Sequence, residues 1–266
     1  LCITLYGDLD VSVIDEMPPF RGKIETKIFK EDQSEDVYLF VKSKIKEGRQ
    51  AYIVYPIIEE SESADLKAAE EMYKKFKKNQ FKDFRLEIIH GRLKDDEAEE
   101  IMTKFKNKEI DVLVATTVLE VGVDVSNATV MVIEHAERFG LSQMHQLRGR
   151  IGRGKHESFC LLIADAATPD AQQRLKAILS TTDGFEIAKQ DLLIRGPGHY
   201  FGRHQHGLNE LKVANPVTQL DILELARQEA MSLIETDSKL EKQEHRLIRQ
   251  IVQRRYPTYL AMVKAG

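Results

Sequence analysis

The segment QLRGRIGRGK, residues 146–155, concentrates three arginines, one lysine and three glycines, and it contains no acid. Glycines let a backbone approach a ligand closely. Arg150 and Arg153 can converge on one phosphate group if they share a helical turn. Arginines presented in this way stabilise charge on a transferring phosphoryl group, as an arginine finger does. With Gln146 and Gly149 the pattern is QxxGRxGR, which predicts phosphate chemistry; a solvated basic turn is the alternative.

Two other patterns resemble nucleotide-binding motifs but fail on their context. Residues 149–155 fit GxxxxGK, yet His156 stands where a P-loop has the Ser or Thr that holds Mg²⁺. A P-loop also follows a strand and opens a helix, whereas this segment follows a helix-like run and precedes an apolar run. The acid pair in VSVIDE, residues 11–16, is followed at once by two prolines, which favours a solvated turn. The sequence therefore identifies neither a P-loop nor a metal-binding acid in this chain.

The elements that must position the arginines alternate between strands and helices. Apolar or alternating runs predict strands, and amphipathic runs between them predict helices. This alternation favours a parallel sheet with helices on both faces, over about residues 23–165. Strands are expected at 23–29, 50–58, 85–91, 111–117, 128–135 and 158–165, and helices at 35–48, 62–78 and 94–107.

Residues 166–266 have a different character and predict a mainly α-helical region, while residues 1–22 read as a linker. No strand pattern occurs after residue 166, and the glycine-rich stretch 194–207 interrupts the helical signals. Helices are expected from Thr168-Pro169 to about Ser180, from Asn215-Pro216 to about Thr236, and from a cap at Asp237 or Ser238 through Arg255.

The carboxyl ends of the predicted strands are the place to look for ligands, because open α/β sheets bind them there. The segments at those ends are residues 90–92, 116–124 and 135–140. The arginine segment follows the last of them, so we expect it at the same edge.

The composition narrows the class of protein. A net charge of −4 means that any contact with nucleic acid must rest on a local basic surface. Cys2 and Cys160 both lie in apolar runs, which fits a reducing cytoplasm and argues against a disulfide or a zinc site. No apolar run approaches the length of a membrane span, so no membrane partner is expected. The chain opens without Met and reads as part of a longer protein.

Several segments together resemble the motifs of superfamily-two helicases. QLRGRIGRG resembles motif VI, residues 112–140 resemble motif V and the segment after it, and residues 50–61 resemble motif IV. HGR at 90–92 matches the segment that follows the next strand. SVIDEMPP, HAERFGLSQMHQLRGRIGRGK and DGFEIAKQDLLIRGPG make the chain similar over its whole length to the RecG family, bacterial ATP-dependent DNA helicases.

The resemblance implies that the chain holds the second RecA-like domain of a motor and its C-terminal region. A wedge domain and a first RecA-like domain would belong to the same protein, and the first RecA-like domain would bind most of the ATP and Mg²⁺. The family pattern makes Arg150 and Arg153 catalytic. It also assigns nucleotide contacts to Gly122, Asp124, Gln146 and Gly149, and DNA contacts to Thr116, Thr117, His90 and Arg92.

Residues 194–207 resemble the translocation motif that RecG shares with the transcription-repair coupling factor. In that family a helical hairpin leads into a loop that couples ATP-driven motion to movement on duplex DNA, which implicates Arg195, Arg203 and Gln205. A passive interhelical loop is the alternative. His199, His204 and His206 are close in sequence, but no Cys or acid completes a ligand set, so we expect no metal.

The predicted function is that of a motor fragment of a cytoplasmic, nucleoid-associated bacterial helicase. The whole protein would remodel branched duplex DNA, at stalled replication forks and Holliday junctions, in recombination and repair. The fragment alone is expected to lack ATPase activity, because the P-loop and DExH acids lie elsewhere. A transcription-repair coupling translocase is one alternative, and a stand-alone nucleic-acid-binding module is another.

Overall fold

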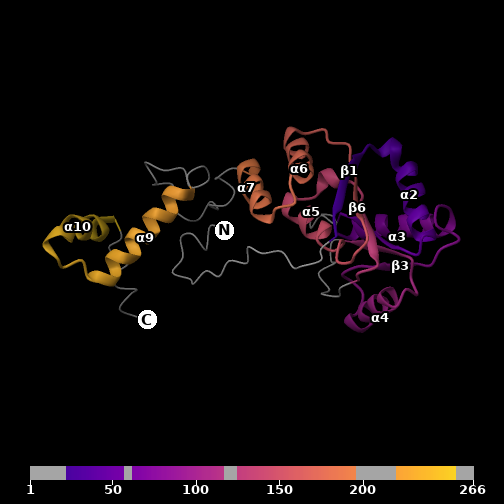
Figure 1. Cartoon of the computed structure of the whole chain (residues 1–266), viewed down its shortest axis with the longest axis horizontal. Coiled ribbons are helices and arrows are strands. Elements are labelled where there is room, and N and C mark those ends of the chain that lie inside the picture. The colour runs from indigo at the N-terminus through magenta and orange to yellow at the C-terminus, as the bar shows by residue number, and fades with distance from the viewer. Residues whose placement is uncertain (1–21, 57–61, 117–124, 196–219, 256–266) are drawn as a thin grey trace. The chain divides into compact units, whose positions relative to one another are not determined.

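A computed structural model of the chain describes residues 22–56, 62–116, 125–195 and 220–255 (Figure 1). These residues fall into two compact units, one containing described residues 22–195 and the other containing residues 220–255. The first unit holds the sheet and carries most of the predicted site residues.

The first unit is built on a six-stranded sheet in which every pair of neighbouring strands is parallel. The strand order is β1-β6-β5-β2-β4-β3, so the chain passes from β1 at one edge through β2 to β3 at the other edge and then returns through β4 and β5 to β6, beside β1. This confirms the predicted parallel sheet. The strands are β1 (Ile24–Phe29), β2 (Gln50–Tyr55), β3 (Leu86–Ile89), β4 (Val112–Thr116), β5 (Ala128–Ile133) and β6 (Ser158–Ile163).

Helices cover both faces of the sheet, and each face has its own hydrophobic core. The side chains of β2 alternate between these cores: Ile53 packs on one face, and Val54 on the other. Every residue of β2, β4 and β5 is buried, which explains their continuous apolar sequences. Helices α2 (Ser34–Lys46) and α3 (Glu62–Lys78) contribute to one core; α4 (Asp95–Lys106) and α5 (Leu141–Arg148) contribute to the other.

Local sequence signals mark several helix ends. Gly48, just beyond α2, has φ +81°, a left-handed conformation that suits glycine. Helix α4 carries three acids in its first turn, where the helix dipole favours them. Thr168 caps α6 (Pro169–Ser180) by accepting a hydrogen bond from the Ala171 N–H, with Pro169 at the first helical position. The predicted start and end of α6 are confirmed.

Helices α6 and α7 (Gly184–Arg195) pack against the sheet unit. Ile178 of α6 and Ile187 of α7 are buried in the same core as α5. The compact unit therefore continues through α7, past residue 165. The functional division of the chain at that position stays a prediction.

The second unit consists, as described, of α9 (Leu220–Thr236), a 3₁₀ turn at Gln243–His245 and α10 (Arg246–Arg255). Helix α9 ends at Thr236 as predicted, and its predicted start lies outside the described residues. The prediction that Asp237 or Ser238 caps the next helix is wrong, because α10 begins at Arg246, whereas the predicted end at Arg255 is confirmed. Asp237 has another role. Its carboxylate instead accepts the N–H groups of Glu241 and Lys242, closing a turn, and Leu240 has φ +51°, which breaks helical geometry.

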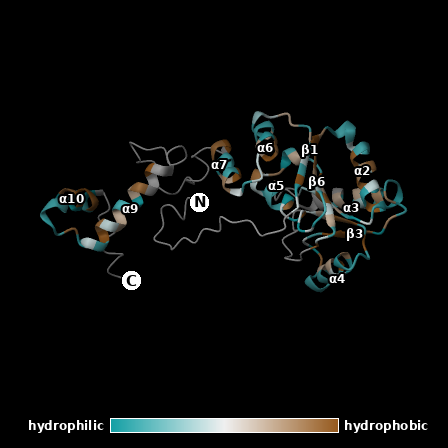
Figure 2. Cartoon of the chain, viewed as in Figure 1, coloured by the Kyte–Doolittle hydropathy of each residue, from teal (hydrophilic) through white to brown (hydrophobic). Residues whose placement is uncertain are grey.

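Both helices of this second unit alternate between apolar and polar residues along their length (Figure 2). Several of their large apolar side chains are exposed, among them Leu225, Ile234 and Leu247. These helices are therefore amphipathic, with apolar surface that the described residues of the unit do not bury.

Candidate functional site

The arginine segment begins where α5 ends. The helix stops at Arg148, and hydrogen bonds extend its last turn to Ile151. Gly152 then adopts φ +77°, a conformation that side-chain-bearing residues rarely take. Arg153 therefore lies beyond the turn that holds Arg150, and the expectation that both arginines share one helical turn is wrong.

The segment lies at the amino edge of the sheet. The Gly152 carbonyl accepts a hydrogen bond of 3.0 Å from the N–H of Gly22, which precedes β1. A Cβ on Gly154 would come within 2.8 Å of the carbonyl of Ser126, which precedes β5. The expectation that the arginines stand at the carboxyl edge is therefore wrong. The physical reason is that β5 and β6 are parallel, so the connection through α5 must return the chain to the amino edge before β6 begins.

The predicted nucleotide residues of this segment differ in exposure. Gln146 and Arg153 are exposed, while Gly149 and Arg150 are half-buried. The Arg153 Nε donates a hydrogen bond of 3.2 Å to the Gly149 carbonyl, which holds this side chain near the end of α5. Gly122 and Asp124 lie outside the described residues.

The third arginine has a structural position that sequence reasoning missed. Arg148 is 3% exposed. Its guanidinium donates to the carbonyls of Ile178 at 2.7 Å and Thr181 at 2.9 Å, at the end of α6. The signal was present in the sequence: Arg148 is four residues after the buried Met144, so both lie on the same face of α5.

Helix α5 is also joined to α7. The Ser142 hydroxyl donates a hydrogen bond of 3.0 Å to the carboxylate of Asp191, which is 3% exposed. A Cβ on Gly184, the first residue of α7, would lie 3.3 Å from His145 Nε2. Continuous contacts thus run from the arginine segment through α5 to α7, whose last residue is Arg195. Arg203 and Gln205 lie outside the described residues.

A row of polar residues crosses the opposite, carboxyl edge. Tyr55 of β2 pairs in register with Thr116 of β4. One residue earlier, Ala115 pairs with Ile89 and Val54 pairs with Ile133. The residues that follow Ile89 and Ile133, which are His90 and Glu134, therefore lie level with Thr116 and Tyr55. The row is therefore His90, Thr116, Tyr55 and Glu134, from β3, β4, β2 and β5.

Three atoms of this row are buried without a hydrogen-bond partner among the described residues: His90 Nδ1, Thr116 Oγ1 and the Tyr55 hydroxyl. Native proteins pair nearly all such groups, so each of these atoms is expected to have a partner beyond the described residues. Arg92, in the turn after β3, is exposed. Of the predicted DNA-contacting residues, His90, Arg92 and Thr116 thus meet at one edge, as the strand ends predicted, and Thr117 lies outside the described residues.

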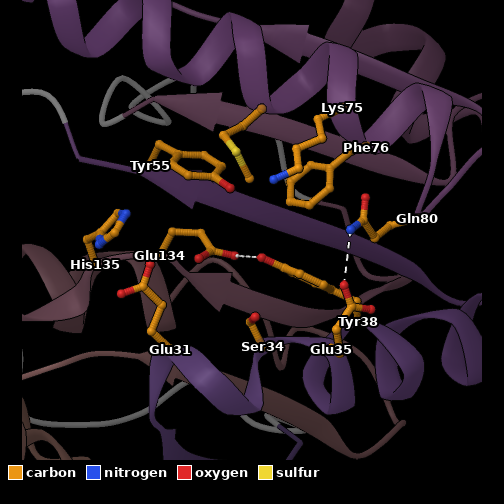
Figure 3. A pocket seen from close by; sticks show the side chains of 11 residues that line it. Glu31, Ser34, Glu35, Tyr38, Tyr55, Lys75, Phe76, Gln80, Glu134 and His135 are labelled. Atoms are coloured by element: carbon orange, nitrogen blue, oxygen red, sulfur yellow. Dashed lines mark hydrogen bonds between the residues drawn. The ribbon is translucent and has the colours of Figure 1, made fainter.

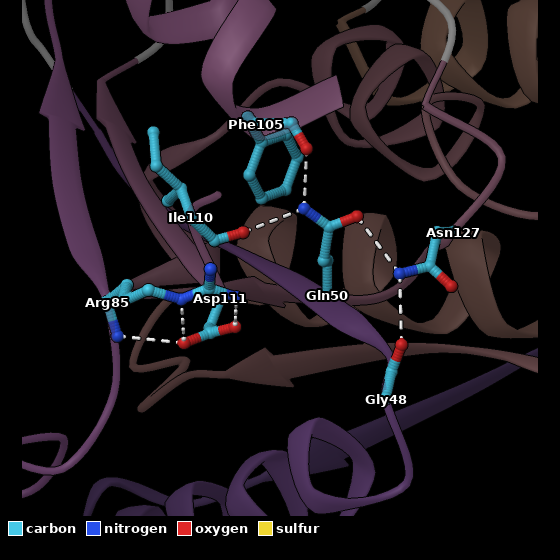
Figure 4. A network of polar contacts seen from close by, with 7 residues as sticks. All are labelled: Gly48, Gln50, Arg85, Phe105, Ile110, Asp111 and Asn127. Carbon is cyan, nitrogen blue, oxygen red and sulfur yellow. Dashed lines mark hydrogen bonds and ion pairs between the residues drawn. The ribbon is translucent and has the colours of Figure 1, made fainter. Parts of the chain in front are cut away.

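The amino ends of the central strands present the opposite case (Figure 4). The Gln50 amide donates to the carbonyls of Phe105 at 2.6 Å and Ile110 at 2.7 Å, and accepts at 3.0 Å from Asn127. Nearby, Arg85 forms an ion pair with Asp111. These polar groups are satisfied within the chain, which indicates a structural role.

The described residues contain no group of three or more His, Cys, Asp or Glu side chains that could hold a metal ion. His199, His204 and His206 lie outside them. Within the same described part of the chain, every helix is too short or too polar to cross a membrane.

Comparison with known proteins links both parts of the chain to one family. Residues 30–155 match the family described as "Helicase conserved C-terminal domain", and residues 181–257 match "ATP-dependent DNA helicase RecG, domain 3, C-terminal". The chain is 48% identical over 241 residues to ATP-dependent DNA helicase RecG of Synechocystis sp., and 45% identical over 249 residues to that of Bacillus subtilis. The matches cover 91% and 94% of this chain, but only 29% and 36% of the relatives.

A solved structure of RecG bound to a three-way DNA junction is similar in fold and sequence. It is 46% identical, with a TM-score of 0.66, over 84% of this chain and 28% of that chain. The sheet domain of the present chain is RecA-like, with a helical region after it.

Proposed function

Because this chain belongs to the RecG helicase family, as its helicase C-terminal domain and the C-terminal part of domain 3, we propose that it forms one half of an ATP-driven motor that acts on branched DNA. The observation that carries the proposal is identity of 45–48% to RecG over more than nine-tenths of the chain. The chain spans about a third of the length of these relatives, so the other half of the motor would come from the rest of the protein. The match of residues 181–257 to RecG domain 3 favours RecG over a coupling translocase.

The amino edge is the nucleotide side in this proposal. Its arginine segment contains no acid and exposes Gln146 and Arg153, which suits a polyphosphate. Arg150 and Arg153 would stabilise the charge that develops as the terminal phosphoryl group is transferred. By the family pattern, Gly122 and Asp124 would contribute to the nucleotide site as well. ATP and Mg²⁺ would be held mainly by a first RecA-like domain of the full-length protein.

The carboxyl edge is the DNA side. Hydroxyl, imidazole and guanidinium groups are common ligands of DNA phosphates, and Thr116, Thr117, His90 and Arg92 supply them. The contacts of Arg148 with α6 and of Ser142 with α7 would link the nucleotide side to α7, which ends at Arg195. That link would let ATP turnover move the translocation residues Arg203 and Gln205 along duplex DNA. The protein would act in the bacterial cytoplasm at the nucleoid.

Two rates measured on the full-length motor test this proposal: ATP hydrolysis with saturating DNA, and unwinding of a branched substrate. Arg153→Ala and Arg150→Ala should each lower hydrolysis by about 10³-fold, with nucleotide binding kept, because a finger acts in the transition state. Lysine at either position should not rescue, since it lacks the planar fork. Lys155→Ala, an exposed neighbour, is the matched control. Near-normal turnover in both alanine variants would refute the assignment of the amino edge.

Coupling is tested by the same pair of rates. Gln205→Ala and Arg203→Ala should leave hydrolysis largely intact while unwinding falls sharply. An unchanged ratio of unwinding to hydrolysis would show that residues 194–207 only connect helices. The 266-residue chain alone should hydrolyse no ATP above a blank without protein, because the P-loop lysine and Mg²⁺ acids supply most of the catalysis.

A further inference from the structure

A cavity of about 230 Å³ opens beside the row of polar residues at the carboxyl edge (Figure 3). It lies between the ends of β2 and β5 and the helices α2 and α3, all within the sheet unit. Drug-sized pockets usually measure about 300–1,000 Å³. This cavity therefore suits one small organic group and would not hold a nucleotide.

Two of its polar groups are built into the protein interior. Glu134 is 5% exposed, and its Oε1 accepts a hydrogen bond of 2.7 Å from the Tyr38 hydroxyl. The Tyr55 side chain is also 5% exposed, and its hydroxyl neighbours that of Tyr38 without forming a hydrogen bond of good geometry. A buried hydroxyl that forms no hydrogen bond of good geometry among the described residues, beside a cavity, favours a ligand that completes it.

The charges around the cavity favour a cation. Its described lining contains three acids, Glu31, Glu35 and Glu134, against one lysine, Lys75, and one histidine, His135. Burial raises the pKa of Glu134 to about 7; the Tyr38 hydrogen bond opposes this rise and the charge on Glu31 adds to it. Burial and the Glu31 charge both disfavour the ionised form of Glu134, and a positive group inside the cavity would offset both.

Aromatic rings complete the walls. The Phe76 ring lies 5.1 Å from Tyr38 at 73°, and 6.4 Å from Tyr55 at 45°, measured between ring centroids. Aromatic faces attract cations, and a guanidinium is planar, weakly hydrated and able to donate several hydrogen bonds to a carboxylate and a hydroxyl at once. We propose that this cavity binds one guanidinium group, with the carboxylate of Glu134 and the hydroxyl of Tyr55 as its hydrogen-bond acceptors.

Calorimetric titration of the 266-residue chain with ethylguanidinium chloride, at constant ionic strength, tests the proposal. At pH 8 we expect a dissociation constant of about 1–10 mM, in line with the small size of the ligand. Glu134→Gln should weaken binding at least about tenfold, because the charged acceptor is lost. Tyr55→Phe should weaken it about threefold, because one acceptor is lost. Ethylammonium, which lacks the planar fork, should bind more weakly than ethylguanidinium.

The pH dependence gives a readout that general folding effects would not reproduce. Affinity should fall about tenfold between pH 8 and pH 6 as Glu134 takes up a proton. In Glu134→Gln this fall should disappear, which separates it from titration of the other groups that face the cavity: Glu31, Glu35, Tyr38, Tyr55, Lys75 and His135.

The outcomes divide clearly. Absence of binding, or equal affinity in wild type and in a Glu134→Gln variant with a normal unfolding transition, would overturn the proposal. Equal binding of sodium and ethylguanidinium would also overturn it. If Glu134→Gln fails to fold, Tyr55→Phe carries the test. The peptide Gly-Arg-Gly identifies the source: similar affinity supports an arginine side chain of a protein, whereas binding of the free cation alone supports a small molecule.

Discussion

At the amino ends of β2 and β5, the amides of Gln50 and Asn127 share a hydrogen bond of 3.0 Å and reach backbone carbonyls on either side. At the carboxyl ends of the same two strands, the Tyr55 hydroxyl has no hydrogen-bond partner among the described residues, and Glu134 lines a cavity. Both sets of groups are almost fully buried. Burial therefore does not distinguish the two sets of groups; hydrogen bonding separates the paired amides of Gln50 and Asn127 from the Tyr55 hydroxyl.

This difference suggests how structural and functional polar residues can be told apart in the sheet. A buried amide that completes its hydrogen bonds within the chain stabilises the fold and leaves nothing for a ligand. A buried hydroxyl left without a partner destabilises the free protein, and binding can recover that free energy. The arginine segment differs from both sets of groups. It lies at the amino edge, beside β1 and β5, and its glycines allow close backbone contacts there.

The largest stability effect that would test this contrast is expected at Gln50. Gln50→Ala removes the partners of two buried carbonyls and of the Asn127 amide, and leaves a cavity. The free energy of unfolding should fall by about 3–5 kcal/mol. Urea denaturation of the chain measures it.

The matched control for Gln50 is Gln172→Ala, which removes a single hydrogen bond to the Ala166 carbonyl from an exposed side chain. That change should cost less than about 1 kcal/mol. Comparable losses of unfolding free energy in the two variants would show that the hydrogen bonds of Gln50 stabilise the fold no more than a single exposed hydrogen bond does.

The next effect is the pH dependence that Glu134 confers. Its pKa is raised from 4.5 to about 7, chiefly by burial, so the folded state holds this proton more tightly than the unfolded state. Stability contributed by this group is therefore lost as pH rises from about 4.5 to 7, and the full penalty, about 3 kcal/mol, applies above pH 7.

Glu134→Gln should remove this penalty while the Gln oxygen still accepts from Tyr38. The variant's advantage in unfolding free energy over wild type should thus grow with pH between 5 and 8, in urea titrations at each pH. Glu99→Gln, on an exposed position of α4, is the matched control and should lack the burial penalty. An advantage that stays constant across this range would contradict the proposed ionisation.

The sequence predicted the sheet well because periodicity reports burial. Fully apolar runs such as β5, and the spacing of Val37, Val41 and Ile45 in α2, follow directly from which faces are covered. Prediction from the sequence failed where the place of a residue depends on how the chain returns across the sheet. The edge on which Arg150 lies depends on the crossover through α5, and the break at Leu240 depends on one backbone angle.

The candidate site shows the same limit. His90 and Thr116 were placed correctly because strand ends define an edge, but Tyr55 and Glu134 were missed. Tyr55 reads as an ordinary apolar strand residue, and only the register of β2 between β4 and β5 brings it beside Thr116 and Glu134. Likewise Arg148 reads as part of a basic cluster until the carbonyls at the end of α6 are seen around it.

The smallest effect has the opposite sign to that at Gln50, and it decides whether the orphaned groups are truly unpaired. Tyr55→Phe and Thr116→Val remove the buried hydroxyls and keep the shape of each side chain. Since no hydrogen bond among the described residues is lost, the chain should become more stable by about 1 kcal/mol in each variant. If the two sites are independent, the gains should add in the double variant to within about 0.5 kcal/mol. Thr129→Val is the control within β5: its hydroxyl is equally buried and has no hydrogen-bond partner in the described parts of the chain, but it lies near the start of that strand, far from the carboxyl edge. It should stabilise the chain to a similar degree and leave DNA binding by the full-length motor unchanged, whereas Thr116→Val should weaken that binding.

Destabilisation by Tyr55→Phe or Thr116→Val would show that these hydroxyls are already satisfied, and the contrast between the two edges would then rest on Glu134 alone.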